Sequence, residues 1–178
     1  KVTDPASGRT VEDELTQQIA TIGENMQLRR AGRVSVENGA VAAYVHNATA
    51  DGMGKIGVLI ALESTGDQAK LQELGKQIAM HVAATRPESV NKEELDQELV
   101  ERERSVLSDQ ARASGKPEEI IEKMVEGRIR KFYEEVVLLE QVFVIDGERR
   151  VSKVLEDAGK ELGAPVKIAA MVRLALGE

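Results

Sequence analysis

The chain has 178 residues, a formal net charge of −7 and no cysteine. This length suits one domain with an insertion or two small domains, and the missing thiols exclude disulfides and zinc–thiolate sites. With two Phe, two Tyr and no Trp, an acidic chain lacks both the basic face and the stacking platforms of a nucleic-acid binder, so we expect a protein partner and no nucleic acid.

A short helix is the first predicted element. Residues 1–9 show no periodicity and suit a linker. A helix is predicted over 10–21 because Val11, Leu15 and Ile19 recur at helical spacing, and Thr10 is placed to cap them. A glycine at position 23 should end this helix, and extended chain should follow.

From Arg33 on, apolar residues recur at every second position, which predicts antiparallel strands, the first over residues 33–37. Val34 and Val36 alternate with polar residues, and Asn38–Gly39 is a strong hairpin signal, so the chain should reverse there into a strand over 41–46. The almost continuous apolar run at 56–62 predicts a strand that is central or buried on both sides. Together these segments predict an antiparallel meander.

The residues after the strands predict a helix that covers the sheet. Leu71, Leu74, Ile78 and Val82 lie on one face of a helix over 68–85. A proline two residues after this helix should stop it.

A long charged segment, 91–137, follows, with thirteen Asp and Glu and nine Lys and Arg. Gly115 and Pro117 supply an end for one helix and a first turn for the next, and Asn91 is a candidate cap. We predict an inserted antiparallel coiled-coil hairpin. Its facing apolar residues would be Leu95, Leu99, Val106 and Ala113 on the first helix, and Ile121, Val125, Ile129, Phe132 and Val136 on the second.

The remaining residues predict a return to the same sheet. We expect extended chain over 136–145, a turn at Asp146–Gly147, a helix over 151–162 and a strand over 166–176 that joins as a fourth. The predicted fold is therefore α+β, an antiparallel meander of three to four strands covered by helices and interrupted by the inserted hairpin.

The residues that could carry chemistry are few. The loop 51–55 lacks the first glycine of a phosphate loop and the Ser or Thr after its lysine, so we expect an exposed loop and no cofactor. His46 and His81 are the only imidazoles, and no ligand spacing such as HExxH accompanies them, so neither a metal site nor a catalytic residue is predicted. By themselves, His46 is typical of a strand-edge residue and His81 of a boundary residue that donates to backbone.

The composition also bears on location. No apolar run approaches the roughly 18 to 20 residues that span a bilayer, so we expect no membrane. A chain without cysteine fits a reducing cytoplasm.

Four motifs in order carry a family resemblance. Residues 21–30 read TIGENMQLRR, 78–84 read IAMHVAA, and 114–128 contain SGKP and KMVEGR; the run LEQVFV at 139–144 has Val142 where a proline is usual. Together they resemble bacterial elongation factor Ts, the family of guanine-nucleotide exchange factors for elongation factor Tu. This resemblance implies an exchange factor of translation elongation that binds nucleotide-free Tu, and no covalent catalysis.

The resemblance also implies site residues and domains. It places Ile22, Gly23 and His46 at the contact with Tu, and Val144 as a weaker contact candidate. Residues 1–32 would form a linker and the end of an amino-terminal core subdomain, and 33–90 with 138–178 an α+β core subdomain around the 91–137 hairpin.

Two questions stay open beside these expectations. A two-to-two assembly with Tu fits the family, and a coiled-coil scaffold or chaperone-like adaptor without exchange activity is the alternative function. Because the family's amino-terminal helical module and its TDFV motif are not in the sequence, we expect the chain to be part of a longer factor.

Overall fold

The computed structural model describes residues 2–178, which divide into one unit that ends at Arg33 and another over Val34–Glu178. None of the described helices is long and apolar enough to cross a membrane. The elements in chain order are α1 (Val11–Ile22), β1 (Gly39–Ala50), β2 (Met53–Glu63), α2 (Gln68–Thr85), α3 (Gln97–Arg112), α4 (Glu118–Val136), the 3₁₀ helix η1 (Leu138–Glu140), α5 (Val151–Leu162) and β3 (Lys167–Ala175).

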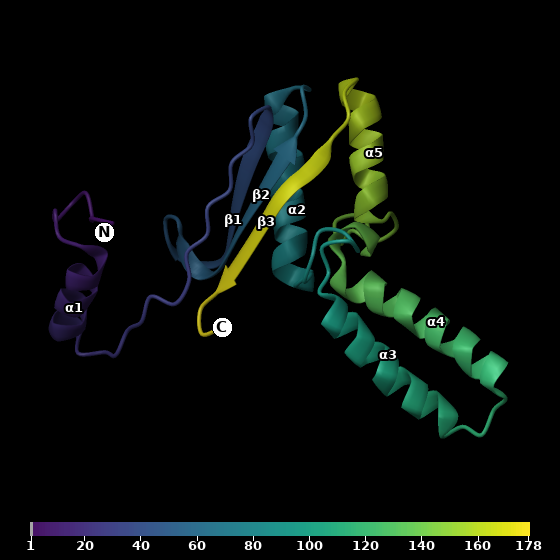
Figure 1. Ribbon diagram of the computed structural model, residues 1–178. Helices are drawn as coiled ribbons and strands as arrows, with labels where there is room; N and C mark the ends of the chain where they lie inside the picture. Colours follow the sequence, from purple (N-terminus) through teal and green to yellow (C-terminus); the bar gives the residue numbers. More distant parts are fainter. Residues whose placement is uncertain (1) are drawn as a thin grey trace. The chain divides into compact units, whose positions relative to one another are not determined.

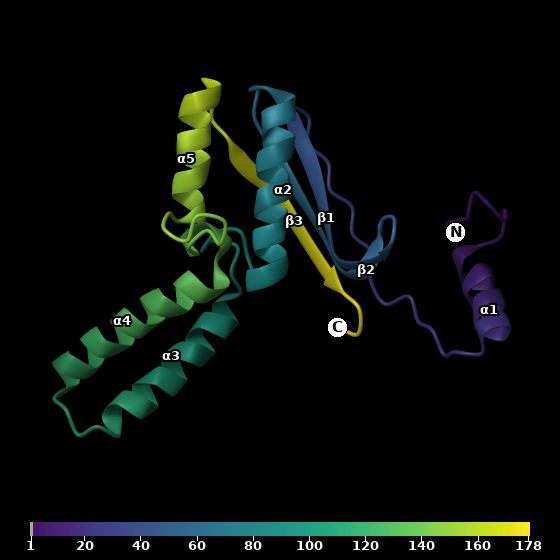
Figure 2. The same ribbon diagram turned by 180° about the vertical axis from the view of Figure 1, so that it is seen from behind.

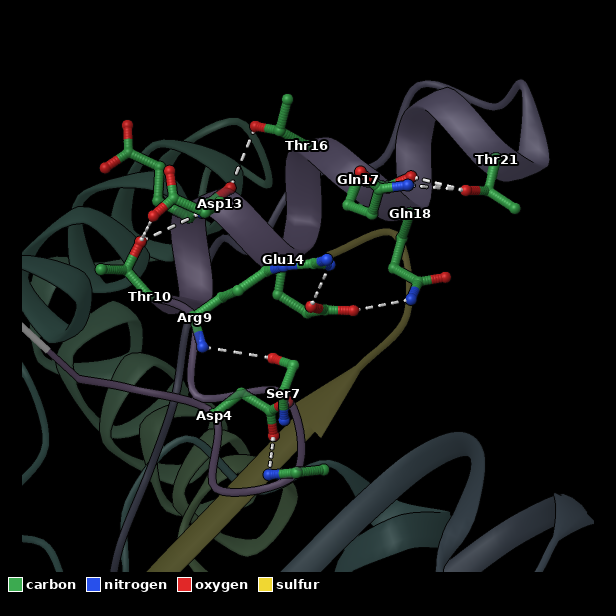
Figure 3. A network of polar contacts seen from close by, with 12 residues as sticks. Asp4, Ser7, Arg9, Thr10, Asp13, Glu14, Thr16, Gln17, Gln18 and Thr21 are labelled. Atoms are coloured by element: carbon green, nitrogen blue, oxygen red, sulfur yellow. Dashed lines mark hydrogen bonds and ion pairs between the residues drawn. The ribbon is translucent and has the colours of Figure 1, made fainter.

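The first unit contains the predicted helix, α1, and its predicted cap. The hydroxyl of Thr10 accepts a hydrogen bond from the backbone N–H of Asp13 at 3.2 Å, and Arg9 forms an ion pair with Glu14 at 3.3 Å (Figure 3). The helix ends at Gly23, whose N–H donates to the carbonyl of Ile19. None of the residues of α1 is buried.

The second unit is built on a three-stranded antiparallel sheet with the order β1-β2-β3, which confirms the predicted meander. In the register, Ala43 faces Leu59, and Leu59 faces Val172. The β1–β2 turn is at Asp51–Gly52. The apolar run predicted as a central strand is β2, and the last predicted strand, β3, pairs with it as the third strand of the sheet.

The strand predicted over residues 33–37 is wrong, and so is the hairpin at Asn38–Gly39. A two-residue type I′ turn needs a positive φ at both residues, but only Gly39 has one, at 141°, and Asn38 does not. The chain therefore runs directly through Gly39 into β1, and the carbonyl of Asn38 accepts from the N–H of Ser64 at 3.0 Å.

The helix α2 covers one face of the sheet, as predicted, and has the predicted bounds (Figures 1 and 2). Asp67 caps it by accepting from the N–H of Lys70 at 2.9 Å. A glycine in the middle of α2, Gly75, allows close approach to β1, because a Cβ there would lie 2.7 Å from the Cβ of Ala42. Helix α5 also has its predicted bounds and contributes Val151, among others, to the same core.

Helices α3 and α4 lie side by side and run in opposite directions (Figures 1 and 2). The predicted break is confirmed, since α3 ends before Ala113 and Pro117 precedes α4. The contact between the helices is apolar and has its own cluster of buried side chains: Leu107, Ala111, Ile121, Val125 and Ile129.

Three details of the predicted α3 are wrong. Ala113, predicted to face the second helix, is exposed and lies just after the end of α3. The helix begins at Gln97 with Asp96 as its cap, whereas Asn91 closes an earlier turn by accepting from the N–H of Glu94 at 2.9 Å. Val106 is 46% exposed, and its neighbour Leu107 is buried in its place. The buried residues of α3 are Val100, Leu107 and Ala111, which recur at spacings of seven and four.

The chain enters and leaves the helix pair at one place. The N–H of Leu138 donates to the carbonyl of Ser89 at 2.9 Å, the N–H of Glu88 donates to that of Val136 at 2.8 Å, and Ser89 and Val137 form a parallel bridge. The prediction of extended chain over 136–145 is therefore wrong in part: α4 runs to Val136 and a 3₁₀ turn follows.

Candidate functional site

The first candidate position is the end of α1. Ile22 is the last residue of the helix and its side chain is 55% exposed. Gly23 has the left-handed φ of 80°, and a Cβ there would meet nothing within 4 Å. An exposed aliphatic side chain and an uncrowded turn backbone therefore lie next to each other, and both are available for contact with another protein.

The second candidate position is on β1, an edge strand of the sheet. His46 is exposed, and its Nδ1 lies 3.1 Å from the hydroxyl of Tyr44, two residues earlier on the same face. Asn47 has a φ of 51°, and the register shifts between Ala48 and Ala50. His46 thus lies where regular pairing ends, with a tyrosine neighbour and with open access to solvent.

The third candidate position is a segment after η1 that we call the valine segment, residues 142–145. Its three aliphatic side chains are exposed: Val142 by 51%, Val144 by 46% and Ile145 by 48%. The residues that alternate with them, Gln141 and Phe143, are only 4% and 2% exposed. Inward and outward side chains therefore alternate over residues 141–144, and a turn that includes the exposed Ile145 follows.

A buried histidine supports the valine segment from within. His81 on α2 has no exposed surface. Its Nδ1 accepts from the backbone N–H of Val144 at 3.2 Å, and its Nε2 lies 2.8 Å from the Oε1 of Gln141. The amide of Gln141 in turn donates to the carbonyl of Glu135 at 2.6 Å, and the hydroxyl of Thr85 lies 3.0 Å from the same Oε1.

The surroundings of His81 fix its charge state. Burial lowers the pKa of His81, because an imidazolium without solvent is unfavourable, and the hydrogen bond to Gln141 opposes this effect only in part. The predicted boundary histidine that donates to backbone is wrong on both counts: His81 is fully buried, and its ring accepts from backbone.

A charged groove lies between α2 and α5, with a volume of about 320 Å³. Its charged walls are paired with one another: Lys70 with Glu161 at 2.6 Å, and Arg149 with Asp157 at 3.2 Å. Among residues 2–178, no group of three or more His, Asp or Glu side chains could hold a metal ion.

The candidate residues come from separate parts of the chain. Ile22 and Gly23 belong to the first unit, whereas His46 on β1 and Val144 in the loop after η1 belong to the second. Sequence reasoning missed Val142 and Ile145 as exposed neighbours of Val144. Because residues 142–145 are all apolar in the sequence, no periodicity there distinguishes the exposed side chains from the buried Phe143.

The comparisons with known proteins agree in one family. The family model described as Elongation factor TS matches residues 1–178. The elongation factor Ts proteins of Rhodospirillum centenum and Rhodospirillum rubrum are 66% and 64% identical to the chain, over 98% and 96% of it and 57% and 55% of their own lengths. That of Parvibaculum lavamentivorans is 59% identical over 98% of the chain and 56% of its own length. The chain thus spans a little more than half the length of these relatives.

Proposed function

Because the chain belongs to the elongation factor Ts family, we propose that it is the part of a guanine-nucleotide exchange factor that binds elongation factor Tu during translation elongation. The observation that carries this proposal is the family match along the whole chain. Its place of action would be the cytoplasm, where translation elongation takes place.

The exchange would need no covalent chemistry in this chain. A factor that binds nucleotide-free Tu more tightly than nucleotide-bound Tu shifts the population toward the free form and so promotes GDP release. The coupling is reciprocal, so bound GDP must weaken the binding of the factor by the same ratio.

The contacts that we propose are Ile22, Gly23, His46 and Val144. Ile22 and Val144 are exposed aliphatic side chains, and His46 is an exposed polar one at an irregular strand end. Their exposure supports the proposal because a buried side chain could not reach a partner without local unfolding.

We also propose that α3 and α4 form a coiled-coil hairpin that extends the partner-binding surface. The apolar seam between them and their many outward charges support this. In this arrangement 33–90 and 138–178 form the core subdomain, 91–137 forms the insert, and 1–32 form the linker with the end of an amino-terminal subdomain. A two-to-two assembly with Tu remains open, and light scattering of the complex would decide it.

Release of a fluorescent GDP analogue from elongation factor Tu tests the proposed function. The intact protein should accelerate release, and the effect should saturate with its concentration. An unchanged release rate would overturn the proposal and favour a coiled-coil scaffold or adaptor without exchange activity.

Two aliphatic substitutions in the first unit test the contact at α1. Ile22→Ala should weaken Tu binding about tenfold, the size expected for a well-packed interface side chain. The control Val2→Ala changes a side chain that is 77% exposed in the same unit and should leave binding unchanged. Equal affinities for both variants would remove Ile22 from the proposed contact, and His46→Ala provides the same test for β1.

A further inference from the structure

One backbone amide of the valine segment donates a hydrogen bond to a buried side chain of the core. That amide belongs to Val144, and it donates to Nδ1 of His81, which lies 63 residues earlier on α2. The side chain of Val144 is 46% exposed, whereas the ring of His81 has no exposed surface. One hydrogen bond therefore connects a buried side chain to an exposed candidate contact.

The hydrogen-bond partners of His81 determine which nitrogen carries its proton. A backbone N–H only donates, so Nδ1 must be the unprotonated acceptor. The proton is then on Nε2, which donates to Oε1 of Gln141 at 2.8 Å. Both ring nitrogens are used, and each reaches a different part of the segment that follows η1.

The same ring also packs against the buried side of this segment. The rings of His81 and Phe143 are 5.7 Å apart between centroids, at an angle of 43°. The backbone of Phe143 is held on both sides, since its N–H donates to the carbonyl of Arg149 at 2.7 Å and its carbonyl accepts from Gly147 at 2.8 Å. With residues 141 and 143 turned inward, the side chains at 142 and 144 must face outward.

We propose that His81 is a positioning residue for partner binding: by accepting from the Val144 amide, it holds the valine segment so that Val142, Val144 and Ile145 form one outward aliphatic surface. The partner is elongation factor Tu, and in this respect the inference rests on the proposed function. His81 itself touches no partner, because it is buried.

Two amide substitutions separate the two bonds of the ring. In His81→Asn, the amide oxygen is attached to Cγ like Nδ1, so the acceptor for Val144 is kept and the donor to Gln141 is lost. In His81→Gln, the amide nitrogen is attached to Cδ and reaches the position of Nε2, so the donor to Gln141 is kept and the acceptor for Val144 is lost. A general packing role would affect both variants alike.

The first measurement is hydrogen exchange of individual amides by NMR in the intact protein. In the unmodified chain, the Val144 amide should be protected although its side chain is exposed. His81→Gln should raise its exchange rate about tenfold more than His81→Asn does, the factor that one net hydrogen bond represents. An unprotected Val144 amide in the unmodified chain would overturn the inference without any variant.

The second measurement is the affinity for nucleotide-free Tu, with folding of each variant checked by circular dichroism. His81→Gln should bind about tenfold more weakly than His81→Asn. Equal affinities, with an unmodified chain that binds, would overturn the positioning role. If the unmodified chain does not bind Tu, the proposed function is overturned, and the exchange rates alone then decide whether His81 positions the segment.

Discussion

Replacing Gly75 by alanine should weaken the contact between α2 and β1. A Cβ at this position would lie 2.7 Å from the Cβ of Ala42, which is 1% exposed and has no room to move. Carbon atoms in contact prefer about 3.5–4.0 Å, so the helix and the strand would have to separate by about 1 Å.

The net effect combines two opposing contributions. Overpacking of this kind costs about 1–3 kcal/mol, while alanine stabilises a helix interior by about 1 kcal/mol relative to glycine. Gly75→Ala should therefore lower the free energy of unfolding by about 1 kcal/mol. Gly127 in α4 is the matched control, because a Cβ there meets no atom within 4 Å, and Gly127→Ala should raise it by about 0.5–1 kcal/mol.

Urea unfolding followed by circular dichroism measures both changes. Adding Ala42→Gly to the Gly75→Ala variant removes the other atom of the clash, so the two substitutions together should cost less than the sum of their separate effects. If Gly75→Ala stabilised the protein as Gly127→Ala does, the argument from close approach would be refuted.

Three further predictions concern charge state, core and cap. Because burial lowers the pKa of His81, the unfolded chain takes up a proton at this residue before the folded chain does, so the free energy of unfolding should fall as pH drops below about 6.5. The difference in unfolding free energy between urea titrations at pH 7.5 and 5.5 should be smaller in His81→Asn. An unchanged difference would refute this. Ile129→Ala, at a 4% exposed site, should lower the free energy of unfolding by about 2–5 kcal/mol. Ile120→Ala, at a 46% exposed site on the same helix, should lower it by less than about 1 kcal/mol in the same unfolding assay. Equal costs would contradict the apolar contact assigned between α3 and α4. Asp67→Ala removes the cap of α2 and should cost about 0.5–2 kcal/mol, measured as a lower melting temperature; no change would mean that the cap contributes nothing.

The elements that the sequence predicted well are those defined by local signals. Helices α2 and α5 have the predicted bounds 68–85 and 151–162, because the apolar periodicity lies within each helix and a proline or glycine follows within two residues of its end. The same holds for the break between α3 and α4 at Gly115 and Pro117.

The errors arose where two local patterns competed. Asn38–Gly39 has the composition of a hairpin turn, but the sheet places the strand pair one segment later, at the Asp51–Gly52 turn. In α3, both Val106 and Leu107 are apolar and adjacent, so periodicity alone does not decide that Leu107 is the buried one. Leu95, just before α3, packs in a cluster with Val100 and Val137 at the end where the helix pair joins the sheet unit.

The support beneath the candidate site could not be predicted from the sequence. His81 and Gln141 are separated by 60 residues, and the pair of helices between them gives no sign that their side chains meet. The exposure of Val144 depends on that meeting, because the inward turn of Gln141 and Phe143 determines which side chains face outward. The family resemblance pointed to Val144 as a contact candidate, but only the fold gives a physical reason why its side chain is exposed.

The parallel bridge between Ser89 and Val137 affects how far the lengths of α3 and α4 can vary. Since the chain leaves and re-enters the sheet unit within one hydrogen-bonded bridge, the span that must be closed does not depend on the length of the helices beyond it. The entropy of closing a longer segment grows only slowly with its length. Whole turns added to or removed from both α3 and α4 would therefore leave the sheet and its covering helices as they are, so the length of the helix pair is free to change independently of the fold that carries it.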